Sequence, residues 1–314
     1  MRAAVNQGKQ SVNVIVTVLE VVVPIFAVAA IGFGWVKLGY DYPQAFITRL
    51  SMLLAMPCLV FVTLARTELS PETLGTVLLA AIVAHVAIGL AMVVLCRIAG
   101  LQRETYLAPL IFGNTGNLGL PLALFAFGQP GLEVAIVIFA VSAVGSFTYG
   151  VWVVSGGGRG ARVLLEPIVL SCFLGAAFLL TGWDLPPIAV RTLDLIGQPA
   201  IPLMLLTLGA AVSRLAVRDL ARPLVLSLLK LVICVAAAIA VARGFGLGQL
   251  AQAVLVLQMI APVAVTGYLI ALRAREAGNP EEDGPDPDAV AGLVVISTLL
   301  SVISLPLVLG FLVG

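Results

Sequence analysis

The stretch "GNTGNLGLP", residues 113–121, interrupts an apolar run between "YLAPLIF" and "LALFAFG". Its three glycines lower the cost of leaving the helical conformation, and Pro121 removes a backbone donor. Asn114 and Asn117 add side-chain amides, which both donate and accept hydrogen bonds. If the run crosses a membrane, unwound backbone at this depth must line a cavity or pack against protein. The stretch therefore predicts a helix break at a functional position.

The composition is that of a polytopic membrane protein. Of 314 residues, 61% are hydrophobic and only 11% are charged, whereas about 25% are charged in an average soluble domain. The net charge of +1 and the lack of a Lys/Arg cluster exclude a nucleic-acid partner. The four cysteines occur singly, without C-x-x-C spacing, so neither a metal site nor a disulfide framework is predicted. We also expect no cofactor.

Apolar runs of about 20 residues, the length that spans a bilayer, predict ten transmembrane helices. They cover residues 12–36, 43–65, 73–96, 104–127, 132–154, 163–182, 188–212, 223–243, 248–272 and 289–313. An even number of spans places both termini on one side of the membrane.

The Lys and Arg residues in the connections set the orientation, because cytoplasmic loops are enriched in them. The odd-numbered connections and their flanks hold eleven: Lys37, Arg49, Arg97, Arg103, Arg159, Arg162, Arg214, Arg218, Arg222, Arg273 and Arg275. The opposite side holds five: Arg2, Lys9, Arg66, Arg191 and Arg243. Both termini are therefore predicted on the non-cytoplasmic side.

Proline spacing indicates an internal repeat. Pro57 and Pro202 are 145 residues apart in similar sequences, Pro24 and Pro167 are 143 apart, and Pro121 and Pro262 are 141 apart. Ser142 and Ser146 likewise match Ser297 and Ser301 at an offset of 155. The repeats would be residues 1–154 and 163–314, joined by a cytoplasmic linker at 155–162. Because each copy has five spans, the second enters the membrane inverted, which is a transporter architecture.

Broken helices at matching places in two repeats indicate a substrate site. Span 4 is interrupted at residues 113–121, and span 9 is interrupted at "MIAPVAVTG", residues 259–267. The half-helices that resume after the breaks favour an anion, although amides alone also suit a neutral polar substrate. Two ordinary proline kinks are the structural alternative. The predicted substrate-binding residues are Asn114, Thr115, Gly116, Asn117, Gly119, Pro121, Pro262, Val263, Thr266 and Tyr268.

At these residues the chain resembles the auxin efflux carrier family, which includes bacterial permeases and the plant auxin exporters. The resemblance rests on N-T-x-x-x-G-x-P at 114–121, P-x-x-x-x-G after Pro262, "MPCLVF" in span 2, and ten spans in two copies. It implies an all-α fold like that of bile-acid symporters and NhaA-type antiporters, with spans 4 and 9 crossing at mid-membrane. Asn114 would contact the substrate carboxylate. The chain lacks the long central loop of the plant proteins and has no asparagine in the span 9 break.

The same resemblance implies how the spans divide. Spans 1, 2, 6 and 7 would form a scaffold that can make a homodimer, and spans 3–5 and 8–10 would form the moving transport domain. The family carries small organic anions, including malonate in bacteria, and a bacterial member would lie in the inner membrane.

Two basic residues fall inside predicted spans, where ionisable groups are costly and default to functional roles. His85 and Lys230 are 145 residues apart, at equivalent positions of the two copies. They could attract the substrate or couple its movement to protons, or they could be a hydrogen-bonded structural histidine and a lysine that reaches the interface. No carboxylate is predicted near either break, in contrast to a cation-binding antiporter.

The sequence thus predicts a secondary transporter of a small carboxylate that works by alternating access. A sodium-coupled symporter of the bile-acid type is the alternative within transport, and a non-transporting membrane sensor or interaction protein is the alternative outside it. An enzyme is not expected, because H-E-x-x-H and G-x-S-x-G are both absent.

Overall fold

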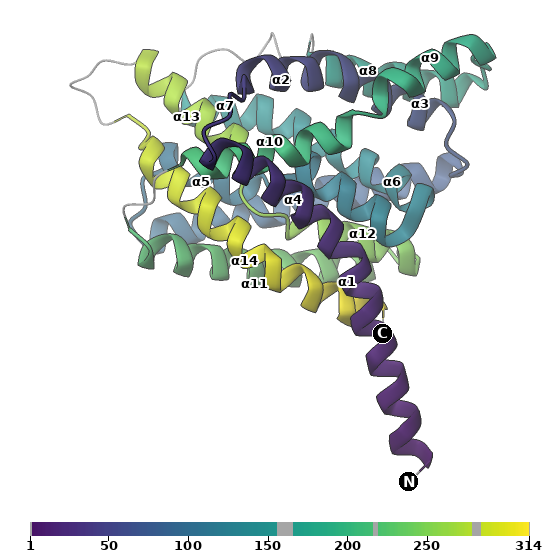
Figure 1. Cartoon of the computed structure of the whole chain (residues 1–314), viewed down its shortest axis with the longest axis horizontal. Helices are drawn as coiled ribbons and strands as arrows, with labels where there is room; N and C mark the ends of the chain where they lie inside the picture. Colours follow the sequence, from purple (N-terminus) through teal and green to yellow (C-terminus); the bar gives the residue numbers. More distant parts are fainter. Residues whose placement is uncertain (1, 156–165, 216–218, 278–283, 314) are drawn as a thin grey trace.

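The computed structural model describes residues 2–155, 166–215, 219–277 and 284–313, with side chains from Val18 to Glu276 and on to Leu312 within these ranges (Figure 1). The predicted linker 155–162 lies, apart from Ser155, outside the described residues, as do Arg159, Arg162 and Arg218. The side chains of Arg2 and Lys9 are also outside them.

Every regular element in the described ranges is a helix. The first half contains α1 (Arg2–Lys37), α2 (Gln44–Leu50), η1 (Ser51–Ala55), α3 (Met56–Ala65), α4 (Pro71–Ile98), α5 (Arg103–Ile111), η2 (Thr115–Gly119), α6 (Leu120–Gly145), η3 (Ser146–Gly150) and α7 (Val151–Val154). The second contains α8 (Pro167–Thr181), α9 (Pro187–Gly197), α10 (Ala200–Arg214), α11 (Ala221–Gly244), α12 (Gln249–Met259), α13 (Val265–Ala277) and α14 (Pro287–Val313). The segments η1, η2 and η3 are π-helical turns that continue directly into the α-helices after them.

Two of the π-helical turns have a local cause in the sequence. Pro57 and Pro121 each occupy the first turn of the helix that follows η1 or η2. A proline ring inside a continuous helix clashes with the carbonyl four residues earlier, and a wider turn relieves such a clash. The effect of Pro121 therefore falls on residues 115–119, and the chain is already helical when it reaches the proline.

Seven described helical stretches are long and apolar enough to cross a membrane. They are Val18–Lys37, Gln44–Ala65, Pro71–Ile98, Thr115–Val154, Pro187–Arg214, Ala221–Gly244 and Pro287–Leu312. Pro167–Thr181 and Gln249–Met259 are shorter apolar helices. The stretch 115–154 is not one straight helix, because Gly128 has φ 65° and ψ −157° and divides α6. The protein is a multi-pass, all-helical membrane protein.

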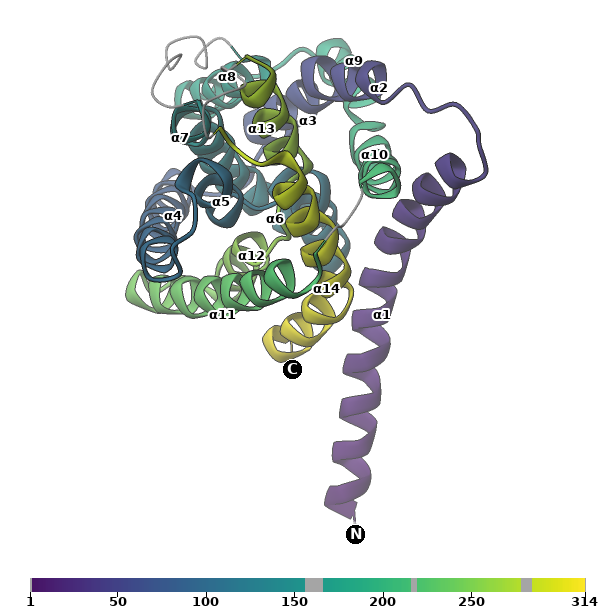
Figure 2. The same cartoon turned by 90° about the vertical axis from the view of Figure 1, so that its left-hand side faces the viewer.

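The helices pack in two groups. In one group α1 lies along α10, while α3 packs against α8 and α9. In the other, α4 contacts α5, α6 and α11, and α11 contacts α12 and α14. Figure 2 shows α1 and α10 on one side of the bundle and α4, α11 and α12 on the other, while α14 contacts both α1 and α11. Cavities lie between the two groups, where residues of α2, η1, α8 and α10 face η2, α6 and α13.

Candidate functional site

The two helix breaks meet in the middle of the helix bundle. The first covers residues 112–114, between α5 and η2, and the second covers 260–264, between α12 and α13. Gly113 and Val263 pair as an isolated antiparallel bridge, and the Asn114 backbone N–H donates to the Pro262 carbonyl at 2.6 Å. Each break thus supplies hydrogen-bonding partners that the other has lost from its own helix.

Local sequence explains where each helix stops. Phe112 takes an extended conformation, with φ −96° and ψ 112°, and Gly113 follows it. A Cβ on Gly113 would lie 2.7 Å from the Ala261 carbonyl oxygen, so only glycine permits this approach of two backbones. In the second break Pro262 disfavours the helical conformation for the preceding residue, and α12 has already ended at Met259.

Asn114 is the residue that joins the break to the helix after it. Its Oδ1 accepts from the Asn117 backbone N–H at 3.3 Å, as an N-cap does. The side chain is 4% exposed, and its Nδ2 has no hydrogen-bond partner among the described residues. A buried amide left in this state costs free energy unless a ligand or water accepts from it.

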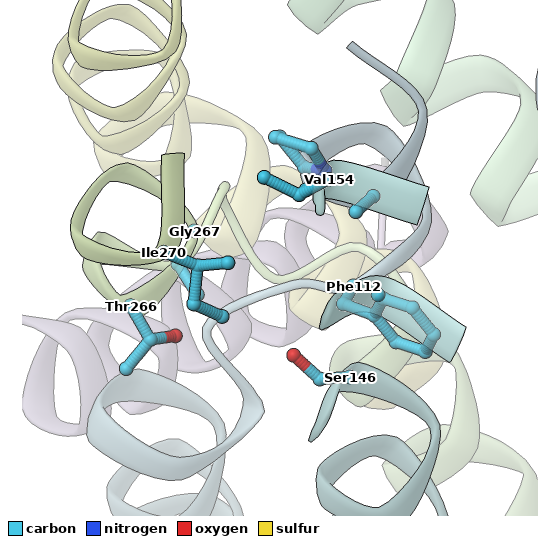
Figure 3. A pocket seen from close by; sticks show the side chains of 10 residues that line it. Phe112, Ser146, Val154, Thr266, Gly267 and Ile270 are labelled. Carbon is cyan, nitrogen blue, oxygen red and sulfur yellow. The ribbon is translucent and has the colours of Figure 1, made fainter. Parts of the chain in front are cut away.

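Asn114 lines a cavity of about 60 Å³ together with Thr115, Gly116, Asn117, Ser142 and Thr266. Thr266 also lines the three neighbouring cavities, so these share a wall on α13. Figure 3 shows the Thr266 and Ser146 hydroxyls pointing into the space between them from opposite sides. The largest of these four cavities measures about 170 Å³ and extends along α13 from Thr266 to Arg273.

Two backbone groups of the second break are paired with side chains from other helices. The Lys230 Nζ donates to the Ala261 carbonyl at 3.1 Å, and the Val263 backbone N–H donates to Ser297 Oγ at 2.9 Å. Lys230 is 3% exposed, so it does not extend to the membrane interface. A cation at the C-terminal end of α12 interacts favourably with the helix dipole.

His85 occupies a different position relative to its break. Its Nδ1 lies 2.8 Å from the Ala81 carbonyl, and because a carbonyl only accepts, Nδ1 carries the proton. The ring stacks with that of Phe112 at 6.0 Å between centroids. His85 therefore packs beside the first break through an aromatic contact, while Lys230 binds the second through a hydrogen bond.

The structure brings most of the predicted binding residues together but not all of them. Asn114, Thr115, Gly116, Asn117 and Thr266 line the cavity at the first break, and Pro262 and Val263 form the backbone contact with it. Gly119 lies in η2 with its Cα facing the Gln258 side chain, which a Cβ would overlap.

Two predicted residues lie elsewhere. Pro121 is helical, beyond η2, whereas Pro262 lies inside the second break, so their pairing in the sequence does not correspond to equal places in the structure. Tyr268 packs against the hydrophobic core and lines none of the four cavities described here.

Sequence reasoning missed two buried polar residues. Gln258 is fully buried against Gly119, and neither of its amide atoms has a partner among the described residues. Glu133 is 7% exposed within the apolar stretch 115–154 and accepts from the Thr67 hydroxyl at 2.6 Å. Each is a single polar residue in an apolar run, and the only available signal was that rarity.

Cys58, Cys96, Cys172 and Cys234 are all free thiols. No group of metal-binding side chains occurs in the part of the chain that the structure describes.

A multi-pass helical bundle with buried amides and hydroxyls around two touching helix breaks has the features of a membrane transporter. Comparison with known proteins agrees. Residues 17–162 match the model of the family described as membrane transport protein, which is the auxin efflux carrier family. The match covers a little under half of the chain, points to a membrane transporter, and confirms the resemblance predicted from the sequence.

Several curated relatives are transporters by name. The chain is 26% identical over 303 residues to an "Uncharacterized transporter" of Methanothermobacter thermautotrophicus, covering 92% of this chain and 96% of the relative. It is 27% identical over 221 residues to a "Putative malonate transporter" of Rhizobium meliloti, covering 60% and 66%. These names indicate a transporter and not an enzyme.

Proposed function

We propose that the protein is a secondary transporter that carries a small organic anion by alternating access around the contact between residues 112–114 and 260–264. One observation carries the proposal: the Asn114 Nδ2 is a buried donor that has no partner among the described residues, on the wall of a cavity between the two groups of helices. A carboxylate oxygen would accept from it and remove the cost of leaving it unpaired.

The surroundings of Asn114 favour an anion over a neutral solute. The side chains of Asn117, Ser142 and Thr266 offer further donors around the same cavity. The helix α13 begins at Val265, beside the cavity, and its first backbone N–H groups have no acceptors within the helix. A helix N-terminus stabilises negative charge. The named malonate transporter among the relatives is consistent with a small carboxylate substrate.

The ten-span, inverted-repeat architecture is part of the proposal. It is supported by the positive φ at Gly128, which divides the stretch 115–154 where spans 4 and 5 are expected to join. It is also supported by the antiparallel pairing of Gly113 with Val263, since inverted copies bring their broken helices together in opposite directions. The copies would be residues 1–154 and 163–314, with the linker 155–162 between them.

The two groups of helices suit a scaffold and a transport domain. The group of α1, α3, α8, α9 and α10 corresponds to spans 1, 2, 6 and 7, and the group of α4, α5, α6, α11, α12 and α14 to the rest. We propose that the second group moves against the first, and that the scaffold forms a homodimer. Both termini would face away from the cytoplasm, in a bacterial inner membrane.

Lys230 and His85 would act by positioning. The Lys230 ammonium holds the Ala261 carbonyl, so its charge lies at the meeting point of the breaks without being an open binding group. His85 would hold Phe112, the first residue of the first break, through the stacking of their rings. This proposal places the substrate on the first break and the structural charge on the second.

A ligand screen tests the proposed function. Purified wild type and Asn114→Ala protein would be heated with a panel of mono- and dicarboxylates that includes malonate. We expect at least one carboxylate to raise the unfolding temperature of the wild type and to have little effect on the variant. A ligand that stabilises both proteins equally would remove Asn114 from the site.

Transport itself would be measured in proteoliposomes, with and without a gradient of sodium or of pH across their membrane. Uptake that requires sodium but ignores pH would favour a sodium-coupled symporter. Failure of the wild type to move any carboxylate would favour a membrane sensor or interaction protein.

A further inference from the structure

Of the four described cavities, the largest is the one whose walls include charged residues. It measures about 170 Å³, and its walls include Glu166 and Arg273. The other three are lined by amides, hydroxyls and apolar groups. Water occupies about 30 Å³ per molecule in the liquid, so the cavity can hold the volume of several waters or of a small carboxylate.

This cavity continues the one at Asn114. The two share Met52, Phe147, Ile168 and Thr266 in their walls. Along α13 the lining residues are Thr266, Leu269, Ile270 and Arg273, whose spacing of three, four and seven residues places them on one helix face. A solute that follows this face passes from the exposed Arg273 to the half-buried Thr266 and then to the break.

Arg273 and Thr266 lie at opposite ends of the α13 face that lines the largest cavity. Seven residues separate Thr266 from Arg273, which corresponds to about 10 Å of α-helix. A three-carbon dicarboxylate is much shorter than that distance. Arg273 lines the largest cavity and Asn114 lines the one beside it, so an anion that follows α13 inward would meet the guanidinium first and the amide second.

The two charged residues of the largest cavity have opposite effects on an anion. Arg273 is exposed and Glu166 is half-buried, and the structure shows no ion pair between them within the described residues. A guanidinium matches carboxylate geometry with two parallel hydrogen bonds. A lining carboxylate repels an anion, so Glu166 limits how firmly the cavity holds it.

We propose that Arg273, opposed by Glu166, forms an outer binding station that captures a small carboxylate and passes it along the α13 face to Asn114. The proposal rests on the proposed function and adds a specificity-determining residue on the side of the membrane where residues 44–52, 166 and 273 lie. Arg273 raises the local concentration of anions at the cavity mouth. Because it is exposed, its effect weakens as salt screens it over a Debye length of about 10 Å at 0.1 M.

The test compares two arginines of the same helix. Arg273→Gln and Arg275→Gln remove the same charge two residues apart, but Arg275 lines none of the four cavities and donates to the Gly284 carbonyl. Uptake of malonate, or of the carboxylate that shifts the wild type most, would be measured into proteoliposomes at low and high salt. We expect Arg273→Gln to raise KM about five-fold at low salt, with kcat nearly unchanged, and Arg275→Gln to change KM less than about two-fold.

Four further measurements keep the result interpretable. Arg273→Lys retains the charge but loses the paired donors of the guanidinium, so its KM is expected to fall between those of Arg273→Gln and the wild type, and Glu166→Gln is expected to lower KM. The KM ratio between Arg273→Gln and wild type should approach one near 1 M salt, where the Debye length is about 3 Å. Thermal unfolding temperatures close to that of the wild type would show that the variants are folded.

Equal changes in KM for Arg273→Gln and Arg275→Gln, or no change for either, would overturn the outer station. If Asn114→Ala still abolishes transport in that case, the proposed function stands without it. If the wild type neither binds nor moves any carboxylate, both proposals fail.

Discussion

The two helix breaks are joined to each other, yet they differ in what they leave open. At the second break Lys230 holds the Ala261 carbonyl and Ser297 accepts from the Val263 N–H. At the first break the Asn114 amide keeps an unpaired donor on a cavity wall. The proposed function accordingly assigns support mainly to the second break and the anchoring of the ligand to the first. Similar broken helices can therefore divide the tasks of support and binding.

The largest loss is expected where the two backbones touch. Gly113→Ala would place a Cβ 2.7 Å from the Ala261 carbonyl oxygen. Because that oxygen belongs to the backbone, it cannot move away as the end of a flexible side chain could. We expect a loss of about 3 kcal/mol in the free energy of unfolding and loss of transport, measured by thermal unfolding in detergent and by uptake.

Gly75→Ala is the matched control for this change. Gly75 lies in α4, and an added Cβ there meets nothing within 4 Å. Because alanine favours helix by about 1 kcal/mol over glycine, this variant should be as stable as the wild type or more so. Equal behaviour of the two variants would contradict the close contact between the breaks.

A smaller loss is expected at the support of the second break. Ser297→Ala leaves the buried Val263 N–H without its acceptor, which costs about 2 kcal/mol. Ser301 is equally buried on α14 but donates only to the Thr298 carbonyl of its own helix, so Ser301→Ala should cost less than about 1 kcal/mol. Unfolding temperatures of the two variants would check the order, and its reversal would count against Ser297 as a support.

The smallest effect is expected at Pro121, because it is helical and lies beyond the first break. Pro121→Ala should change the free energy of unfolding by less than about 1 kcal/mol and ligand affinity by less than about two-fold. Pro262→Ala, in contrast, adds a backbone N–H inside the second break and should cost about 1–3 kcal/mol. An equal loss of ligand binding in Pro121→Ala and Pro262→Ala would show that the sequence pairing of these prolines was the better guide.

Much of the fold could be predicted because membrane helices have a strong composition signal. The predicted runs overlap the observed helices, and the first break lies at the start of the glycine- and asparagine-rich stretch that signalled it. The misplacement of Pro121 has a physical reason: a proline distorts the turn before it, here η2, so its position in the sequence does not mark the end of the helix. Seven described stretches are long and apolar enough to span a membrane, and the count of ten spans stays a prediction.

The site was only partly predictable. Asn114 and Thr266 were found because polar groups beside Gly and Pro interrupt an apolar pattern. Gln258 and Glu133 do not interrupt it, since a single polar residue leaves a helix intact, and only the packing shows that they are buried. The difference between the breaks also depends on Lys230, whose partner lies 31 residues away in the chain. No local pattern predicts which carbonyl a buried ammonium will reach.

The most direct test of the account replaces the side-chain amide of Asn114 by a carboxylate. In Asn114→Asp a side-chain oxygen can still cap the Asn117 N–H, but the free donor becomes a negative oxygen facing the bound anion. Calorimetric titration at neutral pH with the carboxylate that binds the wild type should show at least a roughly 100-fold weaker Kd, since like charges in contact cost several kcal/mol. An unchanged Kd in a variant that unfolds at the wild-type temperature would contradict the assignment of the first break as the binding site.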